Sequence, residues 1–245
     1  MKWRFIWRLL RQAPGPWLLL VSLIGWAIVS AHAFGGTASV AHHQHHGELQ
    51  QLGHHAGIGV WLVMLLAMAP LVLRHEVALL WKNNLPRRRW PAILVFFAGY
   101  GLPWFVLGLV WVWSLAVYSP SGRVLVGALI LLFFWHCAPL RQRYLNLCHR
   151  LPALRAFGGG MFLDMGRFGL RTGVLCCAIC GPAMFFAMSL PAYHAAVMFA
   201  FTAIATIERY LPARRPVWRF TRLLALPEPR WRSLDIPRVS PLETI

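Results

Sequence analysis

Acidic residues are scarce in this sequence: only seven of its 245 residues are Asp or Glu, against 24 Lys and Arg. Charged residues make up 13% of the chain, whereas an ordinary soluble domain carries about a quarter. Hydrophobic residues make up 58%, and the mean hydropathy is +0.56. This composition excludes a typical soluble protein and predicts an all-α, polytopic membrane helix bundle.

Catalytic signatures are also lacking. The sequence has no Ser-His-Asp set, no paired carboxylates and no glycine loop in a context that binds phosphate. We interpret Gly158-Gly159-Gly160 as a hinge before the helix that follows. The net charge of +17 is spread over several loops, which indicates membrane orientation and not a nucleic-acid surface. We therefore expect a binding protein that is not an enzyme and has no nucleic-acid partner.

A disulfide framework is the third absence. The five cysteines are an odd number, and they lie in or near apolar segments or beside basic ones. Secreted disulfide scaffolds have an even number of cysteines in a polar, loop-rich chain. We therefore expect reduced thiols.

Six apolar segments approach the length that a membrane-spanning helix needs. They are Pro16–Phe34, Ile58–Leu73, Pro91–Val117, Val124–Leu140, Thr172–Leu190 and Ala192–Leu211. The first also resembles a signal peptide, because Ala31-His32-Ala33 has the form of a cleavage site. We interpret it as the first of six helices, so that residues 16–211 form one transmembrane domain.

Basic residues set the predicted orientation. Residues 1–15 form a basic amphipathic segment suited to an anionic leaflet, and residues 212–245 form a basic, Pro-rich tail. The N-terminus, the two basic loops at 74–90 and 141–155 and the tail from Arg209 hold four, five, four and eight of the 24 Lys and Arg. Only Arg123 falls in a predicted outer turn. The positive-inside rule thus predicts cytoplasmic termini and an external loop at residues 35–57.

The fifth segment concentrates sulfur. Residues four apart share a helix face, so this segment predicts a stripe of soft ligands formed by Cys176, Cys180, Met184 and Met188. Cys177 precedes Cys180 by three residues, which is the spacing of a two-thiolate clamp. Pro182 is expected to kink the helix nearby. The alternative is that cysteine and methionine only fill the core here.

Further candidate ligands lie in other segments. Met64 with Met68 and His194 with Met198 repeat the spacing of four, and Cys148 follows the fourth segment. Six histidines lie within fourteen residues of the external loop: His42, His43, His45, His46, His54 and His55. Thiolates and thioethers favour Cu(I), and imidazole binds Cu or Zn. We therefore predict copper as the bound metal, with zinc as the alternative.

Charged residues at membrane depth are usually paired or functional. Asp164 and Arg167, three residues apart, are predicted to form a local ion pair. For Glu208 and Arg209, an interfacial role and a functional role both stay open. A b-type haem held by His136 and His194 is excluded, because the predicted topology places these residues toward opposite leaflets.

With these residues collected, the chain resembles a bacterial family described as predicted metal-binding integral membrane proteins, a domain of unknown function. The resemblance covers about Trp61–Pro212. Its motifs are W-x-x-M-x-x-x-M-x-P from Trp61, A-G-Y-x-x-x-W from Ala98, P-L-R-x-x-x-x-x-x-C from Pro139, G-x-x-x-G-x-x-C from Gly169 with Met184, and E-R/K-x-L-P from Glu208. The resemblance implies metal binding and leaves the reaction open.

Three positions depart from that family's pattern. Members tend to have a cysteine four residues before the one that matches Cys148, and here this residue is Tyr144. A histidine commonly precedes the second core glycine, and here it is Thr172. The family's Cys-Cys-Trp run is Ile179-Cys180-Gly181. This chain therefore either holds its metal differently from the family or keeps the fold with part of the site lost.

The leading hypothesis is a six-helix protein of the bacterial inner membrane that binds Cu(I) and transports or delivers it. The histidine loop would collect the ion, the methionines and His194 would relay it, and the cysteines would hold it. Its partners would be membrane lipid, the metal ion and other membrane subunits or a copper protein. The alternative is an accessory subunit or assembly factor of a larger membrane complex, for which the sulfur stripe would only be packing.

Overall fold

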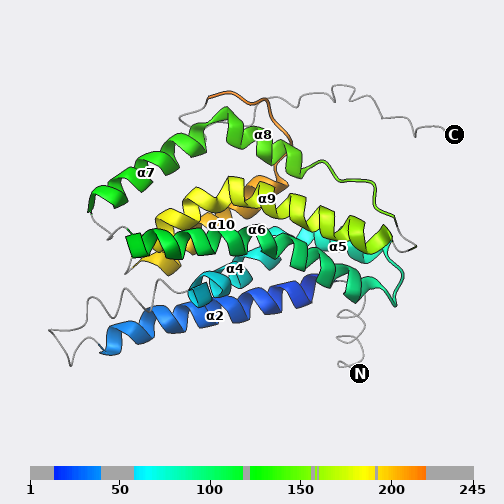
Figure 1. Cartoon of the computed structure of the whole chain (residues 1–245), viewed down its shortest axis with the longest axis horizontal. Helices are drawn as coiled ribbons and strands as arrows, with labels where there is room; N and C mark the ends of the chain where they lie inside the picture. The colour runs from blue at the N-terminus through cyan, green and yellow to red at the C-terminus, as the bar shows by residue number, and fades with distance from the viewer. Residues whose placement is uncertain are drawn as a thin grey trace.

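The computed structural model describes residues 14–39, 58–117, 122–155, 158, 160–190 and 193–218. Within these residues the fold is all-helical and contains no strand, which confirms the predicted class (Figure 1). The helices are α2 (Gly15–Ser39), α4 (Ile58–Val72), α5 (Arg74–Asn83), α6 (Arg89–Val117), α7 (Gly122–Cys137), α8 (Pro139–Cys148), α9 (Gly160–Met188) and α10 (His194–Tyr210). The histidines predicted at 42–55 and most of both terminal segments lie outside the described residues.

Two helices in the described residues are long and apolar enough to cross a membrane: Arg89–Ser114 within α6, and α9. Two bent pairs pass the same test when each is taken as one span. These pairs are α4 with α5, bent by 64°, and α7 with α8, bent by 62°. The described chain thus has two candidate spans, or up to four. The six-span topology with both termini on one side stays a prediction.

The two segments predicted as basic loops are partly helical, so that prediction is wrong. Residues 74–90 contain α5, which buries Val77, Leu80 and Trp81 along one face, and residues 141–155 contain most of α8. Pro139 occupies the first turn of α8, where its missing N–H leaves no hydrogen bond unmade. The preceding Ala138 is extended (φ −67°, ψ 137°), as a residue before proline prefers. The chain therefore turns sharply between α7 and α8.

Helix α9 begins at Gly160, twelve residues before the predicted start at Thr172. The first turns bury Met161, Met165 and Phe168, which repeat at the spacing of one helix face. Asp164 and Arg167 lie on the remaining surface. These charges interrupt the apolar run in the sequence, but they do not interrupt the helix.

Glycines bring α6 and α9 into backbone contact. A Cβ added at Gly169 would lie 2.1 Å from the carbonyl oxygen of Phe96, and one at Gly173 would lie 2.5 Å from that of Tyr100. The two contacts advance together along both helices, so α6 and α9 run parallel. Small residues spaced four apart are a common means of close helix packing in membranes.

Helix α9 is central to the bundle. It packs against α6, α7, α8 and α10, whereas α2 packs mainly along α4 (Figure 1). Its four packing partners and its own sulfur side chains therefore meet in the interior. A ligand bound to the buried side chains of α9 would therefore also contact side chains from the neighbouring helices.

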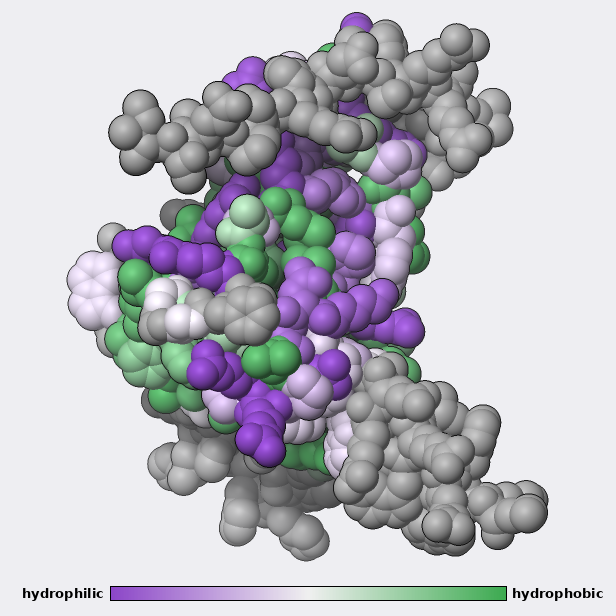
Figure 2. All heavy atoms as spheres, turned by 90° about the vertical axis from the view of Figure 1, so that its right-hand side faces the viewer, coloured by the Kyte–Doolittle hydropathy of each residue, from purple (hydrophilic) through white to green (hydrophobic). Residues whose placement is uncertain are grey.

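Hydrophilic side chains gather at the end of the molecule where α6 and α9 begin (Figure 2). Exposed basic residues there include Arg87 and Arg88 before α6 and Arg155 and Arg167 near the start of α9. The helix sides expose large apolar residues, such as Leu94 and Leu131. This separation of charge from apolar surface is the pattern on which the predicted membrane orientation depends.

Candidate metal site

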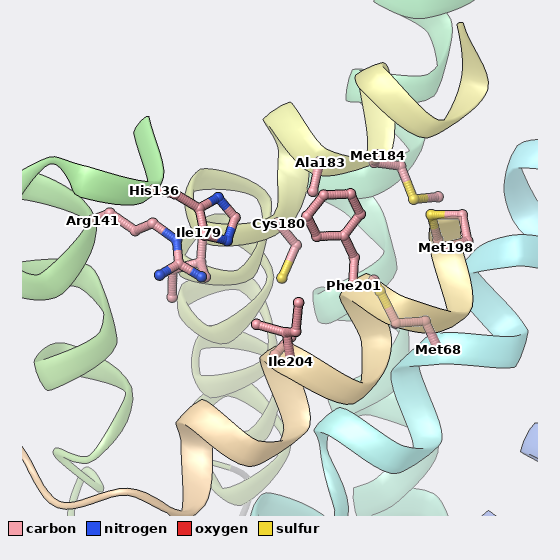
Figure 3. Close-up of a pocket in the computed structure, with 11 residues that line it drawn as sticks. Met68, His136, Arg141, Ile179, Cys180, Ala183, Met184, Met198, Phe201 and Ile204 are labelled. Atoms are coloured by element: carbon pink, nitrogen blue, oxygen red, sulfur yellow. The ribbon is translucent and has the colours of Figure 1, made fainter. Parts of the chain in front are cut away.

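Four sulfur side chains from three helices line one small cavity, which we call the sulfur pocket. Met68 comes from α4, Cys180 and Met184 come from α9, and Met198 comes from α10 (Figure 3). The remaining lining residues are His136, Arg141, Ile179, Ala183, Phe201, Ile204 and Ala205. The free volume is about 10 Å³, which is room for a single water-sized guest.

The thioethers of the sulfur pocket are shielded from solvent. Met68, Met184 and Met198 are each no more than 2% exposed, and Cys180 is 8% exposed. Cys180 and Met184 stand one turn apart on α9, which aims both into the space between α9 and α10. In Figure 3 the sulfur ends of Met184 and Met198 point toward one another, with Met68 on their α4 side. The predicted stripe thus contributes two of its four members to this pocket.

His136 and Arg141 form the polar edge of the sulfur pocket. The His136 ring packs 5.8 Å from that of Phe201, and neither ring nitrogen has a hydrogen-bond partner of normal geometry. The Arg141 guanidinium donates to both carboxylate oxygens of Glu208, with 2.9 Å between Nη1 and Oε1. An unpartnered imidazole beside a thiol can act as a metal ligand. Sequence reasoning placed His136 among the candidate ligands on the inner side of the membrane but did not choose it for the predicted metal site.

Cys176 lies one turn below Cys180 and is fully buried. The Tyr100 hydroxyl donates a hydrogen bond to its sulfur at 3.3 Å. Donors directed at sulfur favour the thiolate, which is the form that binds metal. Cys176 therefore belongs next to the sulfur pocket, although it does not line it.

Several predicted ligands lie away from the sulfur pocket. Met64 and His194 are buried, and Met188 and Cys177 are half-buried, but none of the four lines this cavity. Met188 lies one turn beyond Met184, near the end of α9. Cys177 is adjacent to Cys176 in sequence, so its side chain leaves the helix on a different face. All five cysteines are free thiols, as predicted.

Cys148 lines a second and larger cavity, which we call the polar cavity. Its volume is about 280 Å³, and its chemically active lining residues are His75, Glu76, Cys148, His149 and Arg209. The other lining residues are Leu71, Val72, Leu151, Thr206, Tyr210, Leu211 and Pro212. Burial lowers the pKa of His149 below its usual value, Arg209 and His75 add to this effect, and Glu76 opposes it. The imidazole is therefore held toward its neutral form.

Two ion pairs attach α10 to the bent helix pairs. Arg209 donates to Glu76 at 2.6 Å, and Arg141 pairs with Glu208. Adjacent residues of opposite charge on α10 thus hold α5 and α8. The predicted partner of Asp164 was wrong: Asp164 accepts from Arg155 at 2.8 Å and not from Arg167. Arg155 precedes α9, and its long side chain extends forward over the first turn of the helix to Asp164.

No three His, Cys, Asp or Glu side chains within the described residues lie close enough to hold a metal ion together. A site of zinc type, with three or four such ligands, is therefore not found in this part of the chain. Thioethers fall outside that group, and they supply most of the potential ligands at the sulfur pocket. The sulfur pocket is therefore distinguished by the soft sulfur ligands it offers and not by the number of its ligands.

A comparison with known protein families points to copper. The family model for PpoB2, described as a copper chaperone, matches residues 58–226. This range contains α4 to α10, and with them the whole of the sulfur pocket and the polar cavity. No curated protein and no solved structure matches the chain. The match supports the predicted association with copper and the metal-binding character of the family that the sequence resembles, and the chain belongs to the PpoB2 family of copper chaperones.

Proposed function

We propose that this protein binds one Cu(I) ion in the sulfur pocket and delivers it onward, as a multi-pass protein of the bacterial inner membrane without enzymatic activity. The observation that carries the proposal is the convergence of Met68, Cys180, Met184 and Met198 on one cavity of atomic size. Thioethers and thiolates are the ligands that Cu(I) prefers. The family's description as copper chaperones supports delivery as the outcome of binding.

The chemistry of the pocket walls selects against other cations. No carboxylate lines the sulfur pocket, so hard cations such as Mg²⁺ and Ca²⁺ find no charged oxygen ligand. One Cu(I) with one Cys180 thiolate is neutral overall, and a neutral complex is cheaper to bury than a free ion. Binding then releases the thiol proton. His136 can supply a nitrogen ligand from α7.

Neutral thioether ligands also suit delivery. They hold Cu(I) by soft, exchangeable bonds, and they leave the ion free to move to a thiolate. Cys176 provides such a thiolate one turn away, with the Tyr100 hydroxyl already directed at its sulfur. The protein would therefore keep copper reduced and shielded until an acceptor removes it.

The test is Cu(I) titration of the purified protein in detergent, in competition with a chromophoric Cu(I) chelator. We expect replacement of Met184 and Met198 by leucine to weaken Cu(I) binding by at least about 100-fold, because leucine preserves volume and removes both thioethers. The matched control is Met161→Leu, which alters a fully buried methionine of α9 that lies outside the pocket. Equal Cu(I) affinity in all three proteins would rule out the sulfur pocket as the copper site.

A further inference from the structure

We propose that the polar cavity is a second Cu(I) site, from which copper leaves the protein, with Cys148 as its thiolate ligand and His75 or His149 as its nitrogen ligand. This inference rests on the proposed function, because it assigns the exit of the ion that the sulfur pocket binds. The proposed site has two protein ligands for Cu(I), which leaves space for the thiol of an incoming acceptor. No three His, Cys, Asp or Glu groups converge in the described residues, and Cu(I) needs fewer ligands than zinc does.

Cys176 lies between the two cavities along the proposed route. It stands one turn from Cys180 of the sulfur pocket on α9, and α9 packs against α8, which ends at Cys148 of the polar cavity. We therefore order the thiols as Cys180, Cys176, Cys148. Each step joins soft ligands of the same class, so an ion can pass by ligand exchange without entering water.

The charges around the polar cavity favour a cation. Helices α8 and α10 both end at it, and the last carbonyls of a helix carry partial negative charge. Glu76 is 5% exposed, and its second carboxylate oxygen, Oε2, has no partner. Glu76 neutralises Arg209, with which it pairs. A Cu(I) bound to the Cys148 thiolate would therefore add no net charge.

The shape of the polar cavity suits exchange and not storage. Its volume of about 280 Å³ exceeds what one ion needs, and Leu151, Tyr210 and Leu211 on its rim are exposed. His75 and His149 are also exposed. An acceptor thiol can therefore reach the ion from outside, which the sulfur pocket does not allow.

The exchange is balanced without a redox partner, because copper remains Cu(I) throughout. The bond from copper to the Cys176 sulfur breaks as the bond to the Cys148 sulfur forms, and the proton that leaves Cys148 ends on Cys176. At the next step an acceptor thiol loses its proton, binds Cu(I) and leaves that proton on Cys148. Each step thus moves one Cu(I) ion toward the acceptor and one proton in the opposite direction, toward Cys176.

The first test counts Cu(I) equivalents bound by the full-length protein in detergent. We expect two per chain for the wild type, one for Cys148→Ser, and one for the Met184→Leu/Met198→Leu variant. Cys137→Ala, a buried cysteine that lines neither cavity, should retain two. Two equivalents in Cys148→Ser, or one in the wild type that the methionine substitutions abolish, would overturn the second site and leave the sulfur pocket standing. No Cu(I) binding in the wild type would overturn both.

The second test needs no substitution. Iodoacetamide labelling of the wild-type protein, read at Cys148 by mass spectrometry, should fall at least about tenfold when the second equivalent of Cu(I) is added. Labelling that copper does not change would contradict the proposal. So would a Cys148 that is unreactive without copper, since an exit site must admit an acceptor.

Discussion

The sulfur pocket and the polar cavity differ in almost every physical property. The first has about 10 Å³ of free volume, and thioethers supply most of its potential ligands. The second has about 280 Å³ and contains a thiol, two imidazoles and a buried ion pair. A small, apolar site excludes water and retains one soft ion. A larger, charged site at helix ends admits a second molecule, so the same metal can be held in one and released from the other.

The largest effect is expected from a substitution that removes the charge balance of the polar cavity. Glu76→Gln leaves the buried Arg209 guanidinium without its anionic partner, which typically costs about 3–5 kcal/mol. We expect a lower midpoint of thermal unfolding in detergent. The double variant Glu76→Gln/Arg209→Met should recover part of this loss, because it removes both charges. If Glu76→Gln unfolds at the wild-type temperature, the pair does not stabilise the fold.

Copper loading should stabilise the protein through the sulfur pocket. A ligand at 100 times its Kd adds about 2.7 kcal/mol to the free energy of unfolding. We expect the unfolding midpoint to rise with Cu(I) and to return when a Cu(I) chelator is added. Met161→Leu should show the same rise, whereas Met184→Leu/Met198→Leu should keep only the part of it that Cu(I) in the polar cavity contributes. An equal rise of the unfolding midpoint in both variants would show that Cu(I) does not stabilise the protein by binding in the sulfur pocket.

A smaller effect is expected at the contact between α6 and α9, on which both cavities depend. Gly169→Ala would place a methyl group 2.1 Å from the Phe96 carbonyl oxygen. Overpacking of this kind costs about 1–3 kcal/mol, so the unfolding midpoint should fall and Cu(I) affinity should weaken with it.

The matched control for that substitution is Gly101→Ala, also on a helix of this contact. An added Cβ at Gly101 meets nothing within 4 Å, and alanine favours a helix over glycine by up to about 1 kcal/mol. We expect this variant to be as stable as the wild type or slightly more so. Similar losses in both variants would show that the close contact at Gly169 does not set the result.

The smallest effect should come from Tyr100. Tyr100→Phe removes the hydrogen bond to the Cys176 sulfur, which is worth about 0.5–1.5 kcal/mol. We expect slower transfer of Cu(I) to an acceptor thiol, measured by stopped-flow, with the number of bound ions unchanged. Loss of a bound equivalent would instead make Tyr100 necessary for one of the sites.

Local sequence patterns predicted which apolar segments form helices better than they predicted where the helices begin and end. The apolar segments became helices, but the basic stretches around His75 and Tyr144 became helical as well. Their buried faces are short, and the arginines conceal them in a hydropathy profile. The early start of α9 at Gly160 was missed for the same reason, since Asp164 and Arg167 interrupt the apolar run without facing the core.

The candidate site was predicted in part. The spacing of four placed Cys180 and Met184 together, because helix geometry alone determines that relation. Met68 and Met198 were chosen by the same rule, and they do line the pocket, whereas their partners Met64 and His194 do not. A spacing identifies a helix face, but it does not say which residue on that face meets another helix.

The sequence by itself determined the helical class, the apolar surface, the reduced thiols and the soft-metal character, because each follows from residue type and local periodicity. Only the tertiary structure decided which ligands share a cavity. It joined His136 to Cys180, paired Arg141 with Glu208 and Arg209 with Glu76, and moved Cys148 to a cavity of its own. Such contacts depend on how α9 crosses its neighbours, and the close approach at Gly169 and Gly173 sets the position of α9 against α6.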